Sequence, residues 1–278
     1  MEHQPFSVAM SVYKNDSPVY FDRALESITD QQTIKPDEIV LVVDGPVSEE
    51  TNDIIEKYSK KYNLKAIRLE TNGGLGNALR IATENCSNEL IARMDSDDVA
   101  VSERFEQQLQ FFNDNPNIDI VGGDITEFVD GEANIISRRS VPLDDCSIKK
   151  FMKKRCAMNH VTVMFKKESV MDSGGYLDWF WNEDYYLWIR MWAHGDTFAN
   201  TGVVLVNVRS GLDQFARRGG WKYYKSERGL QRLMLKRRLI SFFRYCCNCL
   251  ARFVIQVLLT KKTRGFILQK MARKKVSK

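Results

Sequence analysis

Short apolar runs alternate with longer amphipathic stretches over the first third of this 278-residue chain. The apolar runs are residues 6–13, 38–43, 65–69 and 89–94, and the stretches between them, with apolar side chains at helical spacing, are 19–31, 48–62 and 74–86. Strands that are apolar along their whole length are buried on both faces, so this alternation predicts a mainly parallel sheet covered by helices. In such a sheet the ligand lies beyond the carboxyl ends of the strands.

The pattern changes after Asn115-Pro116. Further strands are predicted at 118–121, 161–165 and 203–208, a helix at 183–193, and an antiparallel excursion at 124–139 with a turn at Asp130-Gly131. Residues beyond about 221 have a helical pattern, and no repeat or low-complexity linker interrupts the chain before them. We therefore predict one α/β domain over 1–220, with halves 1–115 and 116–220, followed by a helical tail, 221–278.

Three carboxylates, Asp95, Asp97 and Asp98, lie together at the end of the strand 89–94. Like charges this close raise one another's pKa values unless a cation neutralises them. Oxygen ligands favour a hard divalent ion such as Mg2+ or Mn2+, which typically also binds substrate phosphates. The alternative is an acidic loop in which Asp98 or Ser102 caps the following helix. The position at the end of a strand favours the metal interpretation.

Another carboxylate, Asp44, ends the strand 38–43. In a doubly wound sheet Asp44 and Asp95 would end neighbouring strands on the same rim, where Asp44 can accept a hydrogen bond from a nucleobase or ribose. The glycine run 72–79 follows the third strand instead of the first, and Leu79 stands where a dinucleotide-binding loop has its third glycine. We therefore expect a turn with some backbone contact to the ligand, and not a dehydrogenase.

Two adjacent acids, Glu183 and Asp184, follow an aromatic stretch that contains Trp179 and Trp181. Carboxylates suit a helix N-terminus on dipole grounds alone. Aromatic rings beside them also suit stacking on sugars, and a carboxylate in a partly dry cleft can act as a general base. The same chain also has an aspartate cluster of the kind that binds metal ions. It has polar residues at the carboxyl ends of parallel strands, where nucleotides bind. This combination favours the catalytic interpretation.

Taken together, these segments resemble the inverting glycosyltransferases of family 2, which have a GT-A fold, and are similar to the bacterial enzymes that extend O-antigen or exopolysaccharide repeat units. The resemblance covers roughly residues 5–220 and rests on short segments in the family's order: 7–13, 38–45, 72–79, 95–98, 174–176, 183–190 and 217–220. Lys14 departs from the family, which usually has Asn there. The fold implied is a GT-A-like, mostly parallel, doubly wound α/β sheet flanked by helices, with a C-terminal amphipathic helical extension.

Carried over position by position, the resemblance implies a donor site at the strand rim and a base on the helix at 183–193. The residues implied to bind the nucleotide sugar are Ser11, Val12, Tyr13, Asp44, Asn72, Gly74, Asp95, Ser96, Arg217 and Arg218. Asp97 and Asp95 would be the DxD pair, with Asp97 the preferred metal ligand, Asp95 nearer the ribose and Asp98 a competitor for the metal. Asp184 would be the catalytic base, supported by Glu183, and the acceptor cleft would be lined by Gly174, Gly175 and Trp181.

The activity implied is the metal-dependent, inverting transfer of a sugar from a UDP-sugar to a hydroxyl of a lipid-linked, polyprenyl-diphosphate saccharide, with Mn2+ or Mg2+ as cofactor. One alternative is a sugar nucleotidyltransferase or another enzyme that binds an NDP-sugar. A nucleotidyltransferase would need a glycine-rich, basic first loop to hold a triphosphate, and residues 13–16 do not provide one.

Charge divides the chain in two. Of the 41 Lys and Arg residues 15 lie in residues 228–278, where none of the 36 Asp and Glu residues lies. In the tail, polar residues that recur at helical spacing are Arg237, Ser241, Arg244, Asn248, Arg252 and Gln256. The apolar residues on the opposite side are Leu239, Phe243, Cys246, Leu250, Val254 and Val257. This pattern predicts an amphipathic helix at an anionic membrane surface; the alternative is that its apolar face packs on the domain.

A nucleic-acid partner would need basic residues and aromatics on a recognisable platform, which this tail does not provide. The basic tract 149–155 is either a solvated helix face or a contact for a pyrophosphate-bearing acceptor or membrane. The N-terminus has no pattern of a signal peptide, and Arg244 and Arg252 interrupt the longest apolar stretch. We therefore expect reduced thiols and a cytoplasmic protein that is peripheral on the inner face of the membrane.

Overall fold

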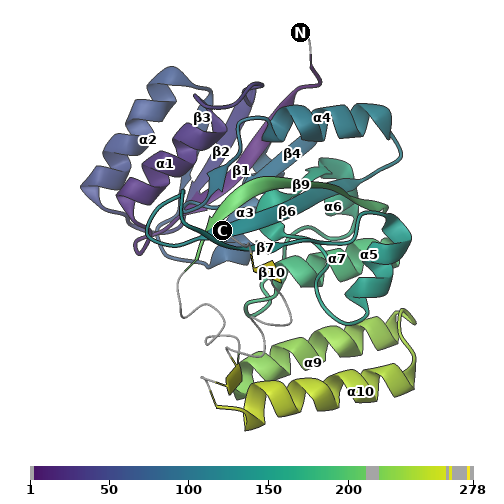
Figure 1. Ribbon diagram of the computed structural model, residues 1–278. Coiled ribbons are helices and arrows are strands. Elements are labelled where there is room, and N and C mark those ends of the chain that lie inside the picture. Colours follow the sequence, from purple (N-terminus) through teal and green to yellow (C-terminus); the bar gives the residue numbers. More distant parts are fainter. Residues whose placement is uncertain (1–2, 211–218, 261–262, 265–273, 276–278) are drawn as a thin grey trace.

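The computed structural model describes residues 3–210, 219–260, 263–264 and 274–275 of the chain. A central twisted sheet has helices on both faces, and a pair of helices from the C-terminal part packs against one end of this body (Figure 1). The strand order is β10-β7-β6-β8-β4-β1-β2-β3, and β9 and β5 extend the sheet beside β6. This arrangement confirms the predicted α/β class.

The first part of the chain alternates strands and helices as the sequence predicts. The strands are β1 (Phe6–Val12), β2 (Glu38–Val43), β3 (Leu64–Arg68) and β4 (Leu90–Met94), and the helices between them are α1 (Pro18–Ile28), α2 (Glu49–Lys61) and α3 (Leu75–Asn85). β1 pairs in parallel with β2 on one side and with β4 on the other, and β2 pairs in parallel with β3. The carboxyl ends of these strands therefore share one rim.

The second part adds mostly antiparallel pairs, so the complete sheet is mixed. Its strands are β5 (Val99–Ala100), β6 (Ile120–Phe128), β7 (Ile135–Arg139), β8 (Met164–Lys166), β9 (Phe198–Arg209) and β10 (Lys274–Lys275). β8 runs antiparallel to β4 and β6, whereas β9 runs parallel to β6. The predicted excursion is the antiparallel β6–β7 hairpin. The strand predicted at 161–165 is shorter, because the 3-10 helix η1 (His160–Thr162) occupies its first residues.

A hydrophobic cluster lies on each face of the sheet. On one face α1, α2 and α4 (Arg104–Asp114) cover β1 and β2 through residues such as Leu25, Tyr58 and Phe105. The other face is covered by α3 together with α5 (Asp145–Met152), α6 (Lys167–Asp172) and α7 (Glu183–His194). β1 shows why both layers are needed, since Val8 and Met10 face the first cluster while Ala9 faces the second.

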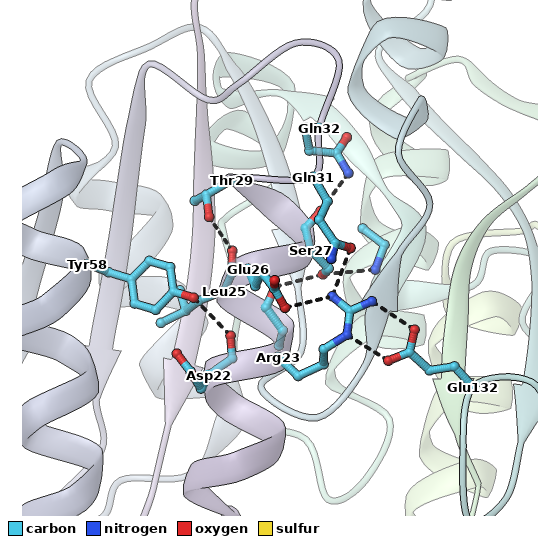
Figure 2. Close-up of polar contacts among 12 residues, drawn as sticks. Asp22, Arg23, Leu25, Glu26, Ser27, Thr29, Gln31, Gln32, Tyr58 and Glu132 are labelled. Carbon is cyan, nitrogen blue, oxygen red and sulfur yellow. Dashed lines mark hydrogen bonds and ion pairs between the residues drawn. The ribbon is translucent and has the colours of Figure 1, made fainter.

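An arginine on α1 joins the two parts of the domain. Arg23 donates through Nε and Nη2 to the Glu132 carboxylate in the β6–β7 turn, at 2.7 and 2.8 Å, and through Nη1 to Gln31 at 2.9 Å (Figure 2). Tyr58 of α2 donates to the carbonyl of Asp22, which lies on α1 with Arg23 (Figure 2). A guanidinium that binds both carboxylate oxygens is geometrically selective, so it fixes where the hairpin lies against α1.

The tail forms an antiparallel helical pair, α9 (Trp221–Lys236) and α10 (Phe242–Phe253), which continues into the π-helical turn η2 (Val254–Leu258). Leu230 and Met234 of α9 join the second cluster of the domain. The predicted amphipathic helix does not run on from Arg237, because a turn with Arg238 at φ 58° separates the two helices.

The polar side of α10 faces the protein. Asn248 donates to the Lys153 carbonyl at 2.8 Å and to Gln231 Oε1 at 2.7 Å. Arg252 pairs with Glu227 of α9 and donates to the Lys154 carbonyl at 2.6 Å. The alternative in which the apolar face of this helix packs on the domain is therefore wrong for α10.

All six cysteines are free thiols in the structure. Within the ranges that the structure describes, no helix has both the length and the apolarity needed to cross a bilayer.

The Glu227–Arg252 pair yields a stability prediction. Both side chains are nearly buried, with exposed fractions of 11% and 12%, so removing one partner leaves a buried charge without its counterion. We expect Arg252→Met to lower the free energy of unfolding by about 3 kcal/mol and Glu227→Gln/Arg252→Met to recover more than half of that loss. Urea unfolding followed by circular dichroism measures both, with the exposed Arg232→Met on α9 as control. A double variant as unstable as the single one would contradict the prediction.

Candidate functional site

The carboxyl ends of β1, β2 and β4 form the rim on which most of the predicted site residues lie. In register, Val12 of β1 pairs with Val43 of β2, and Met10 pairs with Met94 of β4. Asp44 and Asp95 therefore end strands on the same rim, as expected. They do not end neighbouring strands, because β1 lies between β2 and β4. Ser11, Val12 and Tyr13 consequently occupy the centre of the rim.

Asp44 is buried and uses its carboxylate to hold the glycine loop that precedes α3. Its Oδ1 accepts from the Gly73 N–H at 2.6 Å, and its Oδ2 accepts from Gly74 N–H at 3.0 Å and from Asn72 Nδ2 at 2.9 Å. Gly45 follows with φ 87°, and a Cβ there would lie 2.9 Å from the Asn72 nitrogen, so only glycine allows this close approach. Asp44 thus shapes the loop that contains Asn72 and Gly74.

Asp95 is held from below by Arg93, a residue that was not among the predicted site residues. Both terminal nitrogens of the guanidinium bind the two Asp95 oxygens, and the Arg93 side chain is 3% exposed while that of Asp95 is 33% exposed. A buried arginine needs such a counterion. The pair fixes the direction of the Asp95 carboxylate at the rim. The signal in the sequence was an arginine inside an otherwise apolar strand, which is costly unless it is paired.

Asp16 is a further acid at this rim that was not among the predicted site residues. Its Oδ2 accepts from the Ser96 hydroxyl at 2.8 Å and from the Tyr13 N–H at 3.0 Å. Burial raises its pKa, and the charge of Asp95 adds to the rise against those two hydrogen bonds. Asp16 therefore ties the loop after β1 to the aspartate loop after β4.

Asp97 and Asp98 differ sharply in accessibility. Asp98 is buried, and its Oδ1 accepts from the Arg209 N–H at the end of β9 at 2.8 Å. It does not cap the next helix, whose N-cap residue, Glu103, makes no side-chain capping bond. The Asp97 side chain is open to solvent, yet desolvation in its crowded surroundings, followed by the charges of Asp95 and Asp16, raises its pKa to about 6. Burial raises the pKa of Asp98 well above its ordinary value.

This oxygen-only, charge-rich loop fits a hard divalent cation. Of its three aspartates, Asp95 is engaged by Arg93 and Asp98 by the backbone of Arg209, which leaves Asp97 as the accessible one. No set of three or more His, Cys, Asp or Glu side chains in the described ranges is arranged to hold a metal ion. Mg2+ typically binds through one or two carboxylates together with substrate phosphates, so a single accessible aspartate suits such a site.

The acid pair begins α7 and lies within electrostatic reach of the rim. Burial, and then the neighbouring Asp184 charge, raises the pKa of Glu183 to about 7, while Arg93 and Asp95 act on it more weakly. Asp184 Oδ1 accepts from the Tyr185 N–H at 2.6 Å, and the Cys156 thiol lies 3.9 Å from Asp184 Oδ2. The structure therefore brings the predicted base and the aspartate loop to one site.

The predicted acceptor residues divide into two groups. Trp181 is 51% exposed just before α7, with φ 57°, and its ring stacks on Phe180 and meets Tyr223 of α9 edge-on. By contrast, Arg190 donates to the Gly175 carbonyl at 2.6 Å, and it lies on α7 roughly 10 Å along the axis from Glu183. Gly174 and Gly175 thus form a turn that is held against α7. Arg217 and Arg218 lie outside the described residues.

Beneath the rim lies a layer of polar groups within the core. His160 Nε2 lies 2.9 Å from the Tyr176 hydroxyl, and its ring meets Trp188 edge-on. Burial lowers the His160 pKa well below its ordinary value, so the imidazole is neutral. Arg104 is buried as well and donates to the Arg93 carbonyl at 2.6 Å. This layer supports β4 from behind.

The chain is similar in sequence to known glycosyltransferases. The family described as Glycosyl transferase family 2 matches residues 7–172. The amylovoran biosynthesis glycosyltransferase AmsE of Erwinia amylovora is 37% identical over 95% of this chain and 98% of its own length. A UDP-Gal:alpha-D-GlcNAc-diphosphoundecaprenol beta-1,3-galactosyltransferase of Escherichia coli is 37% identical over 97% of both chains.

Solved structures show the same fold. The crystal structure of TarS residues 1–349 from Staphylococcus aureus in complex with UDP-GlcNAc matches with a TM-score of 0.67 at 20% identity, over 96% of this chain and 76% of that one. The same protein in complex with UDP matches with a TM-score of 0.65 at 20% identity, over 96% of this chain and 75% of that one.

The raised pKa of Glu183 predicts a pH dependence of stability. The folded protein holds this proton up to about pH 7, while the ordinary value is 4.5, so stability falls as pH rises between these values and levels off above them. A glutamine at this position cannot ionise. The difference in free energy of unfolding between Glu183→Gln and the native protein should therefore be about 2 kcal/mol more favourable to the variant at about pH 8 than at about pH 4.5. Urea unfolding at both pH values, with the exposed Glu168→Gln as control, measures the difference. An equal gain at both values would contradict the assigned shift.

Proposed function

The chain belongs to glycosyltransferase family 2, and on that premise we propose that it transfers a sugar, with inversion, from a UDP-sugar to a hydroxyl of a lipid-linked saccharide in bacterial surface polysaccharide synthesis. The observation that carries this proposal is the acid pair of α7 within electrostatic reach of the aspartate loop after β4. An inverting transfer needs one base and one means of stabilising a leaving diphosphate, and these two groups supply them.

The donor is proposed to lie along the rim. Ser11, Val12 and Tyr13 line its centre, and the loop with Asn72 and Gly74 closes one side. Asp44 acts on this side chiefly by holding that loop; of its two oxygens, Oδ1, which accepts a single bond from the loop, has a lone pair left for the nucleotide. Asp95 and Ser96 lie on the opposite side, and the Arg93 fork fixes Asp95 before the donor arrives. The UDP complexes of the TarS structure, which has the same fold, support a uridine diphosphate here.

Asp97, with Asp95 beside it, is proposed to hold Mg2+ or Mn2+ through its exposed carboxylate, with Asp98 kept as a competitor. When bound, the divalent ion would act as a Lewis acid that stabilises charge on the departing diphosphate. Neutralisation would also relieve the repulsion that raises the Asp97 pKa. Asp98 is the weaker candidate because it already accepts the Arg209 N–H in a buried setting.

Asp184 is proposed as the base. It lies in the first turn of α7, at the positive end of the helix dipole, and the Tyr185 N–H orients one of its oxygens. As the acceptor oxygen attacks the anomeric carbon from the side opposite UDP, Asp184 takes the hydroxyl proton and the bond from the anomeric carbon to UDP breaks. Glu183, with its pKa near neutrality, supports this step by orienting the acceptor hydroxyl. No covalent intermediate forms, so the configuration inverts.

The acceptor is proposed to approach from the side of α7 and α9. The exposed Trp181 offers a face for sugar stacking beside the acid pair. One relative at 37% identity is a galactosyltransferase named for a GlcNAc-diphosphoundecaprenol acceptor, which supports a lipid diphosphate for this chain also. The enzyme would then act at the inner face of the bacterial membrane.

A transfer assay tests the proposal. With Mn2+ and a synthetic polyprenyl-diphosphate GlcNAc acceptor, at least one member of a panel of UDP-sugars should release UDP only when the acceptor is present. Asp184→Asn should lower this rate by about 10²- to 10⁴-fold, because an amide cannot take the proton, while its affinity for UDP stays unchanged. Asp53→Asn on the exposed face of α2 is the matched control. Near-normal transfer by the Asp184 variant would rule out this base.

A second experiment tests the metal ligand. Asp97→Ala should abolish the increase in UDP affinity that Mn2+ produces, as measured by titration calorimetry with and without the ion. Asp114→Ala, an exposed acid at the end of α4, should retain the full increase. Should the increase persist in the Asp97 variant and vanish in a folded Asp98→Ala variant, the ligand would be Asp98 instead.

A further inference from the structure

The outer side of α10 is an uncovered apolar surface. Phe243, Leu250 and Leu258 are 77%, 65% and 62% exposed, and they recur at seven- and eight-residue intervals along α10 and η2. Cys247 and Val254 lie between them and are exposed as well, so the stripe is continuous. Next to it, Phe242 is 69% exposed at the first position of the helix. A soluble surface rarely shows large apolar side chains in such a row without a partner.

This orientation is fixed by the opposite side of the helix. Asn248 and Arg252, one turn apart, bind the carbonyls of Lys153 and Lys154, and Arg252 also pairs with Glu227. Gln256 continues this side and is buried, with its carbonyl accepting from the Gly220 N–H at 2.8 Å. A rotation that buried Phe243 and Leu250 would break these bonds, so the apolar side stays outward.

A basic hollow lies at the start of the same helix. It has a volume of about 480 Å³, and its walls include Lys153 from the end of α5, Arg238 from the turn between α9 and α10, and Arg244 from α10. The apolar part of the wall is Leu235, Leu239 and Ile240. Within the described part of the chain none of these three basic side chains forms an ion pair. Three unpaired cations around one hollow suit a phosphate group.

We propose that the outer side of α10 and this hollow together form a docking surface for an anionic phospholipid bilayer, with Phe242, Phe243 and Leu250 inserted among the acyl chains and Lys153, Arg238 and Arg244 holding a lipid phosphate. Charge complementarity favours lipid over a second copy of the chain, because the apolar stripe is bordered by cations and a symmetric contact would bring like charges together. The basic tract around Lys153 thereby gains a role that the sequence left open.

The surface lies on the acceptor side of the active site, and this part of the inference rests on the proposed function. Ser226 of α9 accepts from Trp179 and Asn182 in the segment just before the acid pair. Arg252 of α10 binds the Lys154 carbonyl, two residues before Cys156, whose thiol lies beside Asp184. A membrane against α10 would therefore present a lipid-anchored acceptor to the side of the site where Asp184 lies.

Vesicle sedimentation tests the surface independently of catalysis. The full chain should bind vesicles of phosphatidylcholine with phosphatidylglycerol more tightly than vesicles of phosphatidylcholine alone. Phe243→Ser/Leu250→Ser should weaken partition at least about tenfold, through lost apolar contact. Arg238→Gln/Arg244→Gln should weaken it about 25-fold and reduce its dependence on salt. The controls are Val19→Ser/Val203→Ser for exposed apolar residues and Lys60→Gln/Lys65→Gln for exposed cations, and both should bind as the native chain does.

Other outcomes also have a defined meaning. An environment-sensitive fluorophore on Cys247 should shift to the blue with anionic vesicles, whereas one on the exposed Cys146 of α5 should not. Unchanged partition of both test variants would overturn the docking surface, as would a native dimer in solution that Phe243→Ser/Leu250→Ser dissociates. Transfer to a water-soluble diphosphate-sugar acceptor should survive in both variants. If the native chain did not carry out this transfer, that result would contradict the proposed function, while the vesicle result would still stand.

Discussion

The accumulation of negative charge at one end of a buried sheet is the constraint on which the rest of the site depends. Asp16, Asp95, Asp97 and Asp98 gather where β1 and β4 end, and Glu183 lies within their electrostatic reach. This gathering of carboxylates is unfavourable for the free energy of folding, because the charges are partly removed from water and repel one another. Arg93 is the principal compensation that the structure provides, buried beneath the rim and joined to Asp95. On the proposed function, a substrate phosphate with its cation would supply the remaining compensation.

Much of this could be predicted from the sequence, because the strands of a covered parallel sheet are apolar throughout and end in polar residues. Strands β1 to β4 and the positions of Asp44 and Asp95 followed from that rule alone, whereas Glu183 was found from the acid pair that begins a predicted helix. Strand order did not, since it is set by pairing between distant segments. β1 therefore came to lie between β2 and β4, and Asp44 proved to be a support for the glycine loop.

The residues that the sequence did not reveal act through contacts that no local pattern encodes. Arg93 and Asp16 acquire their roles from Asp95 and Ser96, which a hydrophobic pattern does not connect to them. The tail shows the same limit at the level of a whole helix. Its spacing predicts two faces, but amphipathicity alone does not say which face meets the protein. Asn248 and Arg252 decide that question, because their carbonyl partners lie in the segment between α5 and η1 and their carboxylate partner lies on α9.

The charge division of the chain acquires a physical meaning once that orientation is known. Residues 1–227 contain all 36 acids and 26 of the 41 basic residues, so this part of the protein is repelled by an anionic bilayer. Screening at physiological salt limits that repulsion to about 8 Å, which makes the charges nearest the lipid decisive. The cations of the α9–α10 turn lie on the protein surface beside the apolar stripe, where attraction and insertion reinforce each other. On the proposed docking surface such an arrangement orients the protein as well as attracting it, because an approach through α10 brings these cations to the lipid together with the apolar stripe.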